Sequence, residues 1–292
     1  MSDRYSIETE LREGARVLEE AGVLNPTREA TSIWAALVGV QPGDVWLTRE
    51  DVAPESLANQ FRELTRRRAE GEPLPYVVGI AGFRKLDLKV DKRALIPRPE
   101  TEGLVHLVLE WCESREWAAP GNWGLAVDVG TGTGCIALSL AVEGRFARVV
   151  AIEKSQAALD LAAENVSAVA PKTPVELRNG SLLDSVDETS VSVIVSNPPY
   201  VTVSEYYRLE QSVTNFEPRE ALVSDDDGIE HTRTLLETAA CRMITGGLLA
   251  IEVDSTRAGM VHNLARKLGW PNTRIEADLF GRPRFLLATK ET

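Results

Sequence analysis

The first seventy residues of the chain alternate apolar and polar side chains at helical spacing. Apolar residues recur every three or four positions in three segments, which run over about 6–22, 27–37 and 54–69. This spacing places the apolar side chains of each segment on one face of a helix. Gly22 and Gly39 follow the first two segments, as is typical where helices end. The pattern predicts a small helical N-terminal domain over residues 1–75.

The pattern changes after residue 75. Leu86, Leu88 and Val90 alternate with polar residues, and the preceding stretch GEPLPYVVGIAGF contains several turn-forming residues. Strict alternation over a few residues is typical of a half-buried strand. We therefore expect a short β-hairpin within residues 76–98, which links the helical domain to the rest of the chain.

From residue 99 onward, apolar runs typical of buried strands alternate with helical segments. The expected strands are 125–129, 149–152, 175–177, 191–195, 248–253 and 284–288. The expected helices are 135–142, 155–166, 233–243 and 261–268. Strands that alternate with helices predict a mainly parallel, doubly wound α/β sheet. Residues 99–292 are thus expected to form the larger domain.

Charge and composition narrow the possible functions. The 292 residues carry a formal net charge of −12, and the only dense basic run is Arg66–Arg68. Proteins that bind nucleic acid usually present a basic surface, because neutralising phosphates supplies much of their affinity. The acidic balance therefore disfavours direct nucleic-acid binding.

The chain shows no sign of a membrane segment, a secretory signal or a metal site. No apolar run is long enough to form a membrane helix, and the polar N-terminus lacks a signal-peptide pattern. The three cysteines, Cys112, Cys135 and Cys241, are far apart and form no CxxC motif. This spacing argues against both a disulfide framework and a zinc site. We expect a reduced, cytoplasmic protein without a bound metal.

A glycine-rich turn, VDVGTGTG, joins the strand at 125–129 to the next helix. Its glycines at 130, 132 and 134 are separated by Thr131 and Thr133. Glycine lets the backbone approach a ligand closely. The dinucleotide pattern G-x-G-x-x-G is absent, because Cys135 occupies the position of its last glycine. The arrangement D-x-G-x-G-x-G resembles motif I of S-adenosylmethionine-dependent methyltransferases.

Two acidic residues lie near this turn. Glu153 ends the strand VVAIE and can accept hydrogen bonds from both ribose hydroxyls of a nucleoside cofactor. That requirement is shared by nicotinamide cofactors, and an exposed carboxylate at the end of a strand would look the same. Asp128 either organises the turn or accepts a hydrogen bond from the amine of a methionine-derived cofactor.

The strand at 191–195 ends in the stretch SNPPY. Proline restricts the preceding Asn197 to extended conformations, and Pro198 and Pro199 have no N–H to donate. The corner therefore offers two acceptors, the side-chain oxygen of Asn197 and the carbonyl oxygen of Pro198, beside the flat ring of Tyr200.

Two fixed acceptors suit a planar amino group. The candidates are adenine N6, cytosine N4, guanine N2 and the side-chain amide of glutamine. Each nitrogen is a weak nucleophile, so orienting it and stabilising the charge that develops on it lower the barrier to methyl transfer. From the residues alone, all four amines remain candidates.

Over essentially its whole length the chain resembles the HemK/PrmC family of protein-(glutamine-N5) methyltransferases. The matching stretches are RRRAEGEPLPYVVGIAGF (66–83), LIPRPETEGLV (95–105), DVGTGTGCIALSLA (128–141), VSNPPY (195–200), FEPREAL (216–222) and DLFGRPRFLLA (278–288). The resemblance implies a class I methyltransferase fold, Rossmann-like, behind a small helical N-terminal domain. LIPRPETE upstream of the glycine turn makes the match specific, because NPPY is shared with DNA adenine and RNA guanine methyltransferases.

The resemblance also implies the roles of the site residues. Contacts with S-adenosylmethionine, and with the product S-adenosylhomocysteine, are expected from Asp128, Gly130, Thr131, Gly132, Thr133, Gly134, Glu153, Leu182 and Asn197. Asn197, Pro198 and Tyr200 would be catalytic. Together with Pro199 they would hold the substrate glutamine. Arg98 and Glu100 would line the site, unless they only form a local salt-linked turn.

The implied substrate is the glutamine in the Gly-Gly-Gln motif of class-1 peptide chain release factors, so that methylation would modulate translation termination. The helical domain would help to bind the factor. The alternatives are the ribosomal-protein glutamine methyltransferase branch, an RNA or DNA amino-methyltransferase, and a non-catalytic binding module. The last would be favoured by a damaged glycine turn or a missing Asn197, and both are intact.

Overall fold

The computed structural model describes residues 5–117, 122–225 and 227–291 of the chain. These residues form two compact units. The first takes the described residues up to Ile80 together with Glu210–Phe216, and the second takes Ala81–Leu209 and the described residues from Glu217 onward. The boundary after Ile80 falls within the predicted hairpin segment, 76–98. No local pattern had assigned residues 210–216 to the first unit.

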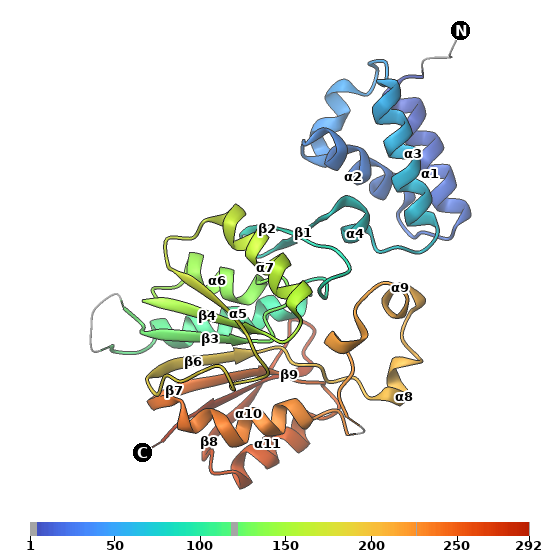
Figure 1. Ribbon diagram of the computed structural model, residues 1–292. Helices are drawn as coiled ribbons and strands as arrows, with labels where there is room; N and C mark the ends of the chain where they lie inside the picture. Colours follow the sequence, from blue (N-terminus) through green and yellow to red (C-terminus); the bar gives the residue numbers. More distant parts are fainter. Residues whose placement is uncertain (1–4, 118–121, 226, 292) are drawn as a thin grey trace. The chain divides into compact units, whose positions relative to one another are not determined.

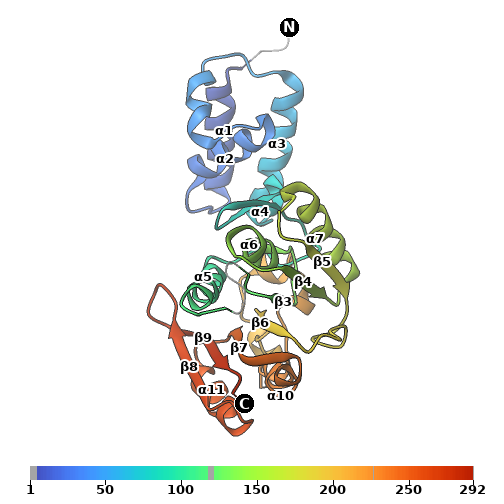
Figure 2. The same cartoon turned by 90° about the vertical axis from the view of Figure 1, so that its left-hand side faces the viewer.

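The first unit is helical (Figure 1). It contains α1 (Ile7–Glu20), α2 (Pro26–Val38), the 3-10 helix η1 (Pro42–Thr48), α3 (Glu55–Ala69), α4 (Leu74–Val78) and, from the second segment, α9 (Gln211–Thr214). Helices α1, α2 and α3 pack against one another (Figure 2). Trp34 and Phe61 meet edge to face at their centre, with ring centroids 5.3 Å apart. Both aromatic rings lie in the hydrophobic core of this unit.

A two-stranded hairpin follows these helices in the chain. It consists of β1 (Ile80–Phe83) and β2 (Leu86–Lys89), which form their own small sheet. Phe83, Leu86 and Leu88 are buried, while the residues between Leu86 and Leu88 and after it are exposed. This alternation is the one that predicted the hairpin.

The second unit is built on a seven-stranded sheet. Its strands, in spatial order, are β5 (Val175–Asn179), β4 (Arg148–Glu153), β3 (Leu125–Val129), β6 (Val191–Ser196), β7 (Met243–Glu252), β9 (Pro283–Thr289) and β8 (Asn272–Ala277). The first five strands are parallel, and β9 runs antiparallel to both of its neighbours. The order runs outward from β3 in both directions, which confirms the predicted doubly wound α/β fold.

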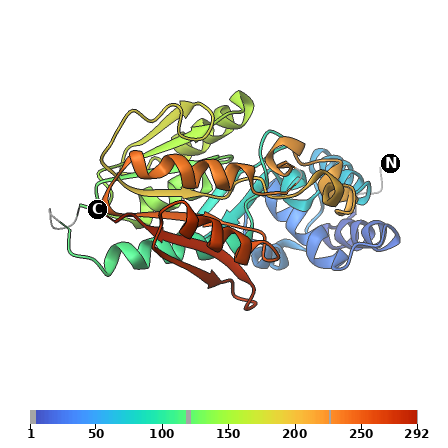
Figure 3. The same ribbon diagram turned by 90° about the horizontal axis from the view of Figure 1, so that it is seen from below.

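Helices cover both faces of this sheet (Figures 1 and 3). One face carries α5 (Pro99–Glu113), α6 (Cys135–Glu143) and α7 (Gln156–Val169). The other carries α10 (Glu230–Thr238) and α11 (Ala258–Lys267). The remaining short helices are α8 (Val203–Tyr206), η2 (Arg219–Ala221) and η3 (Ala239–Cys241).

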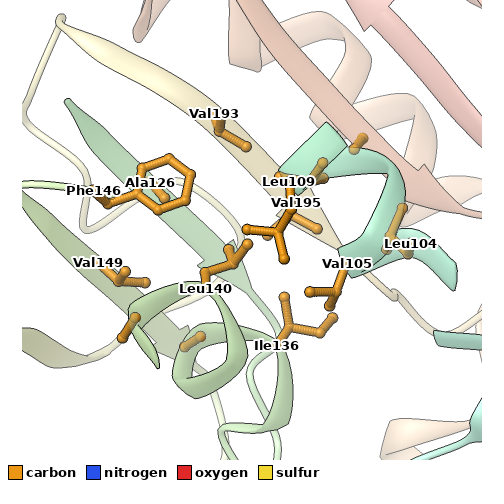
Figure 4. Packing of buried hydrophobic residues seen from close by; sticks show 14 of the residues in the cluster. Leu104, Val105, Leu109, Ala126, Ile136, Leu140, Phe146, Val149, Val193 and Val195 are labelled. Atoms are coloured by element: carbon orange, nitrogen blue, oxygen red, sulfur yellow. The ribbon is translucent and has the colours of Figure 1, made fainter. Parts of the chain in front are cut away.

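Apolar packing on the first face holds α5 and α6 against the central strands. Leu104, Val105 and Leu109 of α5 meet Ile136 and Leu140 of α6 beside the valines of β6 (Figure 4). Burying one side chain of this size stabilises the fold by about 1.5–3 kcal/mol. This packing fixes the first turn of α5 near the end of β6, where the stretch SNPPY begins.

The structure corrects the boundary between one predicted helix and the strand after it, and it adds elements that the sequence pattern did not predict, among them β8 and α5. The helix expected over 233–243 is α10, which ends at Thr238, and Met243 instead starts strand β7. Ala239 and Met243 are four residues apart, which is a spacing typical of a helix. The pattern therefore extended the predicted helix to Met243, where the strand begins. Strand β8 was not expected, because it lies at the sheet edge and only some of its residues are partly buried. The fifteen-residue helix α5 was not expected either.

Candidate active site

The candidate site lies where four neighbouring strands end at one level of the sheet. Near these ends, the residues that pair between neighbouring strands are Ile152 in β4, Val129 in β3, Ser196 in β6 and Ile251 in β7. The next residues along the chain, Glu153, Gly130, Asn197 and Glu252, therefore lie side by side at this edge of the sheet. In open α/β sheets this carboxyl edge is where ligands bind.

The glycine turn leaves open space beside its backbone. Gly130, Gly132 and Gly134 have φ angles of 74°, 55° and 84°. These values lie in the left-handed region that favours glycine. A Cβ atom added to Gly130 or Gly132 would meet nothing within 4 Å. The amides of Gly130 and Thr131 both donate to the carbonyl of Ile152 at 2.9 Å, which ties the turn to β4. The turn is thus anchored on one side and open on the other.

Asp128 is fully buried beneath this turn. Its Oδ2 accepts a hydrogen bond from the Thr131 hydroxyl at 2.6 Å and one from the Ala137 amide at 3.0 Å. Burial raises the pKa of Asp128 to about 7, although both hydrogen bonds act to lower it. Asp128 therefore organises the turn through Oδ2. Among the described residues, its Oδ1 and the hydroxyl of Thr133 are buried and have no hydrogen-bond partner.

Glu153 stands beside the turn at the end of β4. Its Oε2 accepts from the Gly132 amide and its Oε1 from the Ser155 amide, each at 2.9 Å. Each carboxylate oxygen has a second lone pair, so both can still accept a hydrogen bond from a ligand. The carboxylate is half-buried and held by backbone, which differs from an exposed side chain at the end of a strand.

Leu182 lies in the loop after β5, which meets the end of β4 where the Gly180 amide donates to the Glu153 carbonyl at 3.1 Å. Its φ angle is 50°. This conformation costs energy for a residue with a side chain. Leu182 is partly buried against the apolar core on the second face of the sheet. The structure therefore places Leu182 on the β4–β5 side of the site, two residues after Gly180, which bonds to Glu153.

The Asn-Pro-Pro-Tyr corner is held by side chains from other elements. The Nδ2 atom of Asn197 donates to the hydroxyl oxygen of Thr101 at 3.0 Å, and this hydroxyl donates to Glu252 Oε2 at 2.8 Å. The Tyr200 hydroxyl donates to the other carboxylate oxygen, Oε1, at 3.3 Å. Pro198 is buried. Because Nδ2 of Asn197 donates to Thr101, the Oδ1 atom of the same amide points away from Thr101.

Sequence reasoning did not identify Thr101 and Glu252. Thr101 lies within the quoted stretch LIPRPETEGLV, in the first turn of α5. Glu252 ends the apolar run LLAIE, just as Glu153 ends VVAIE. The signal that identified Glu153, an acidic residue at the end of a buried strand, would also have found Glu252.

Arg98 and Glu100 are not paired with each other. The Arg98 guanidinium donates to Glu217 Oε1 at 2.6 Å, and the Ile96 amide donates to Glu217 Oε2 at 3.3 Å. Glu217 is buried, so Arg98 braces the segment before α5 against a carboxylate more than a hundred residues further along the chain.

Glu100 acts on Glu252 through its charge. Burial raises the pKa of Glu252 to about 7, and the negative charge of Glu100 adds to this effect.

Arg257 supports the backbone of the corner. Its guanidinium donates to the Tyr200 carbonyl at 3.5 Å and to Glu205 Oε1 at 2.7 Å. It also pairs with Asp254 at 3.2 Å. These contacts link the start of α11 to the segment after Tyr200, so the backbone of the corner is braced as well as its side chains.

The expected site residues therefore fall into two adjacent groups. Asp128, the turn 130–134, Glu153 and Leu182 lie along β3, β4 and β5. Residues 197–200, Arg98 and Glu100 lie at the end of β6 and the start of α5. Asn197 follows the strand that pairs with β3, so it stands between the groups. Within the described ranges, no three acidic, histidine or cysteine side chains come together as a metal would need. The same residues contain no helix long and apolar enough to cross a bilayer.

Two family models match the chain. Residues 10–79 match the PrmC N-terminal domain, and residues 118–215 match the methyltransferase small domain. The first match covers most of the helical unit. The second begins before β3 and extends past the Asn-Pro-Pro-Tyr corner.

Curated relatives match nearly the whole chain. The release factor glutamine methyltransferase of Moorella thermoacetica is 38% identical over 281 residues, which cover 95% of this chain and 96% of the relative. The protein of the same name from Rhodopirellula baltica is 35% identical over 271 residues, covering 92% and 91%.

A solved structure supports the fold. The hMettl16 catalytic domain, in complex with the MAT2A 3′UTR hairpin 6, superposes with a TM-score of 0.58 over 89% of this chain and 92% of that one. The identity is 16%, so this likeness speaks for the fold alone.

Proposed function

The chain belongs to the family of release factor glutamine methyltransferases, and from this premise we propose its substrate, its cofactor and the roles of its site residues. The reaction is transfer of the methyl group of S-adenosylmethionine to N5 of the glutamine in the Gly-Gly-Gln motif of class-1 release factors. The observation that carries this proposal is the orientation of Asn197. Its Nδ2 is bonded to Thr101, so its Oδ1 is available as an acceptor beside the Pro198 carbonyl.

The residues along β3 and β4 fit S-adenosylmethionine. The open backbone at Gly130 and Gly132 leaves room for a ligand, and, within the described part of the chain, Asp128 Oδ1 and the Thr133 hydroxyl are unpartnered polar atoms. Glu153 keeps a lone pair on each oxygen for the ribose hydroxyls. Leu182 would support the adenine ring. When bound, S-adenosylmethionine supplies an electrophilic methyl group on a sulfonium.

The corner orients the substrate amide. Asn197 Oδ1 and the Pro198 carbonyl would accept the two N–H groups of the glutamine side chain, while Pro199 and the ring of Tyr200 would confine its plane. As the nitrogen lone pair is withdrawn from the amide, positive charge develops on nitrogen, and the two fixed oxygens stabilise it. Because the bound nitrogen becomes acidic in this way, its proton can leave afterwards without a strong base nearby.

The helical unit would recognise the release factor. This role, proposed for residues 1–75, is supported by the match to the PrmC N-terminal domain. Trp46 and Leu47 in η1 are exposed, as apolar contact residues of a protein partner would be. Release factors act at the ribosome, so we propose that the protein works in the cytoplasm and that methylation modulates translation termination.

A transfer assay with labelled S-adenosylmethionine tests this function. The purified protein is incubated separately with a release factor, with the same factor carrying Gln→Ala in its Gly-Gly-Gln motif, with ribosomal protein and with tRNA. We expect label only in the unmodified release factor, and mass spectrometry should place one methyl group on the glutamine. Label in ribosomal protein would favour the related branch of the family, and label in tRNA alone would overturn the substrate.

A further inference from the structure

Glu252 carries a carboxylate that is buried in the second unit. Its residue is 1% exposed, and the residue it bonds to, Thr101, is 2% exposed. Burying an ionised carboxylate is costly unless hydrogen bonds and nearby charges compensate. Arg284 acts on Glu252 through its charge but donates its hydrogen bond to Asp278 at 3.3 Å. The position of Glu252 therefore needs an explanation other than a direct ion pair.

The order of donors and acceptors in this network determines how Asn197 is oriented. The Thr101 hydroxyl donates to Glu252 at 2.8 Å. A hydroxyl has a single proton to donate, so the same oxygen can then only accept a hydrogen bond. It therefore faces the Nδ2 of Asn197 and not its Oδ1. An Asn197 amide with its oxygen and nitrogen exchanged would present its NH2 group to a substrate NH2 group, donor against donor.

We propose that Glu252, acting through Thr101, is a positioning residue that holds the Asn197 amide with its oxygen toward the substrate nitrogen. This inference rests on the proposed function, in which Asn197 accepts from the glutamine amide. Glu252 also accepts from the Tyr200 hydroxyl, so one carboxylate sets the amide and the ring on two sides of the substrate. Neither Glu252 nor Thr101 touches the reacting atoms.

The protonation of Glu252 controls this arrangement. An ionised carboxylate accepts from both hydroxyls, whereas a protonated one can donate to Thr101 and so free the threonine proton for Asn197 Oδ1. Burial raises the pKa of Glu252 to about 7, with Thr101, Arg284 and Tyr200 acting against it and Glu100 adding to it. Methyl transfer is therefore expected to weaken as the pH falls through about 7.

Of the other groups around Glu252, Tyr200, Cys135 and Arg284 do not titrate near pH 7. Burial raises the pKa of Tyr200 and raises that of Cys135 to about 12, so both stay neutral near pH 7. Burial acts to lower the pKa of Arg284, but Tyr200 and Glu252 raise it, so Arg284 stays charged. Asp128 also has a pKa of about 7, but it holds the glycine turn. Because we place the cofactor at this turn, the titration of Asp128 is expected to change the affinity for the cofactor. A saturating concentration of cofactor compensates for that change, so kcat reports on Glu252.

Two substitutions test the relay in the full-length protein. Thr101→Val keeps the shape of threonine and removes the hydroxyl, and Thr101→Ser keeps the hydroxyl. At pH 8.5 and saturating cofactor, we expect Thr101→Val to lower kcat by about 10- to 100-fold with little change in cofactor affinity. Thr101→Ser should restore most of the activity. The matched control is Thr273→Val on the edge strand β8, where the buried hydroxyl has no partner among the described residues.

Glu252→Gln tests the titration. The wild-type protein should lose kcat below pH 7, and Glu252→Gln should show a flat profile between pH 6 and 8.5. At pH 8.5 its kcat should be lower by about tenfold, since an amide offers one acceptor oxygen in place of two. A wild-type kcat in Thr101→Val, or an acid limb that persists in Glu252→Gln, would overturn the proposal.

An NMR measurement separates this proposal from the proposed function, because it needs no substrate. The side-chain amide signal of Asn197, assigned by its loss in Asn197→Ala, should shift with pH with a midpoint near 7. The shift should disappear in Glu252→Gln and Thr101→Val and persist in Thr273→Val. If the wild-type protein methylates no release factor, the proposed function fails, while an unchanged Asn197 signal in Thr101→Val contradicts the relay. Circular dichroism checks that each variant is folded.

Discussion

The glycine turn and the Asn-Pro-Pro-Tyr corner lie side by side at the carboxyl edge of one sheet, but different parts of the chain hold them. The turn is held by its own backbone, by Thr131 and Ala137, which bond to Asp128, and by β4, the next strand in the chain. The corner is held by side chains from α5 and β7. Thr101 of α5 bonds directly to Asn197, which lies 96 positions further along the chain. Glu252, the last residue of β7, bonds to Thr101 and so holds Asn197 indirectly.

This difference fits the roles that we propose for the two regions. A turn that wraps around a cofactor needs close backbone approach, which a short stretch of glycines provides by itself. A corner that aims an amide needs a side chain in one of two nearly equivalent orientations. Only hydrogen-bond partners can select between those orientations, and the partners come from elsewhere in the fold.

Removing the amide of the corner should have the largest effect. In Asn197→Ala the substrate nitrogen loses one of its two acceptors, and we expect kcat to fall by at least about 10²–10³-fold. Steady-state assays with a release factor at saturating S-adenosylmethionine measure this loss. Thermal unfolding should show that the variant stays folded. Turnover within a few fold of wild type would mean that Asn197 does not orient the substrate.

Filling the space beside the turn should have the next largest effect. In Gly132→Ala the added Cβ meets nothing in the protein, so the free protein bears only the strain of a φ angle of 55°. Such strain costs about 1–2 kcal/mol. A bound cofactor also loses room, and we expect its affinity to fall by about 10- to 100-fold in calorimetric titration.

The matched control for this change is Gly39→Ala. Gly39 has a φ of 71° at the end of α2, and a Cβ there also meets nothing within 4 Å. The two variants share the backbone strain, so both should lose stability, but only Gly132→Ala should lose cofactor affinity. Equal affinities in the two variants would contradict a cofactor site at the turn.

The smallest expected effect is on the pH dependence of stability. Folding raises the pKa of Asp128 from an ordinary value of about 3.9 to about 7, so the folded protein binds this proton more tightly than the unfolded chain. This contribution to stability is fully present below about pH 4 and is lost as the pH rises through 7. In Asp128→Asn the free energy of unfolding should therefore fall less between pH 5 and 8, by about 1–3 kcal/mol.

Chemical denaturation at several pH values measures this slope. Glu176→Gln is the control, because the hydrogen bond from Arg178 lowers the pKa of this exposed carboxylate below the range tested. It should leave the slope between pH 5 and 8 unchanged. A slope in Asp128→Asn as steep as that of the wild type would show that Asp128 is ionised throughout this range.

Much of the fold could be predicted because it depends on local patterns. The buried parallel strands are continuous apolar runs, and the hairpin strands alternate. The errors have physical causes. Ala239 and Met243 keep a helical spacing although β7 begins at Met243, and β8 is an edge strand whose partly exposed residues form no apolar run.

The site divides in the same way. Glu153 and the glycine turn were found because a strand end and a glycine pattern are visible in a few residues. Arg98 and Glu100 were expected to line the site, with a local salt-linked turn as the alternative, but the carboxylate partner of Arg98 is Glu217, 119 residues away. No spacing rule connects residues that far apart, so the partner could not be predicted.

The sequence by itself determined the doubly wound sheet, the glycine turn and the presence of a rigid Asn-Pro-Pro-Tyr corner, because each depends on neighbours in the chain. Only the tertiary structure decided which way the Asn197 amide points. The register of β6 with β7 and the packing of α5 bring Glu252 and Thr101 to this amide. A hydrogen-bond chain has a direction only once all of its donors and acceptors are in place.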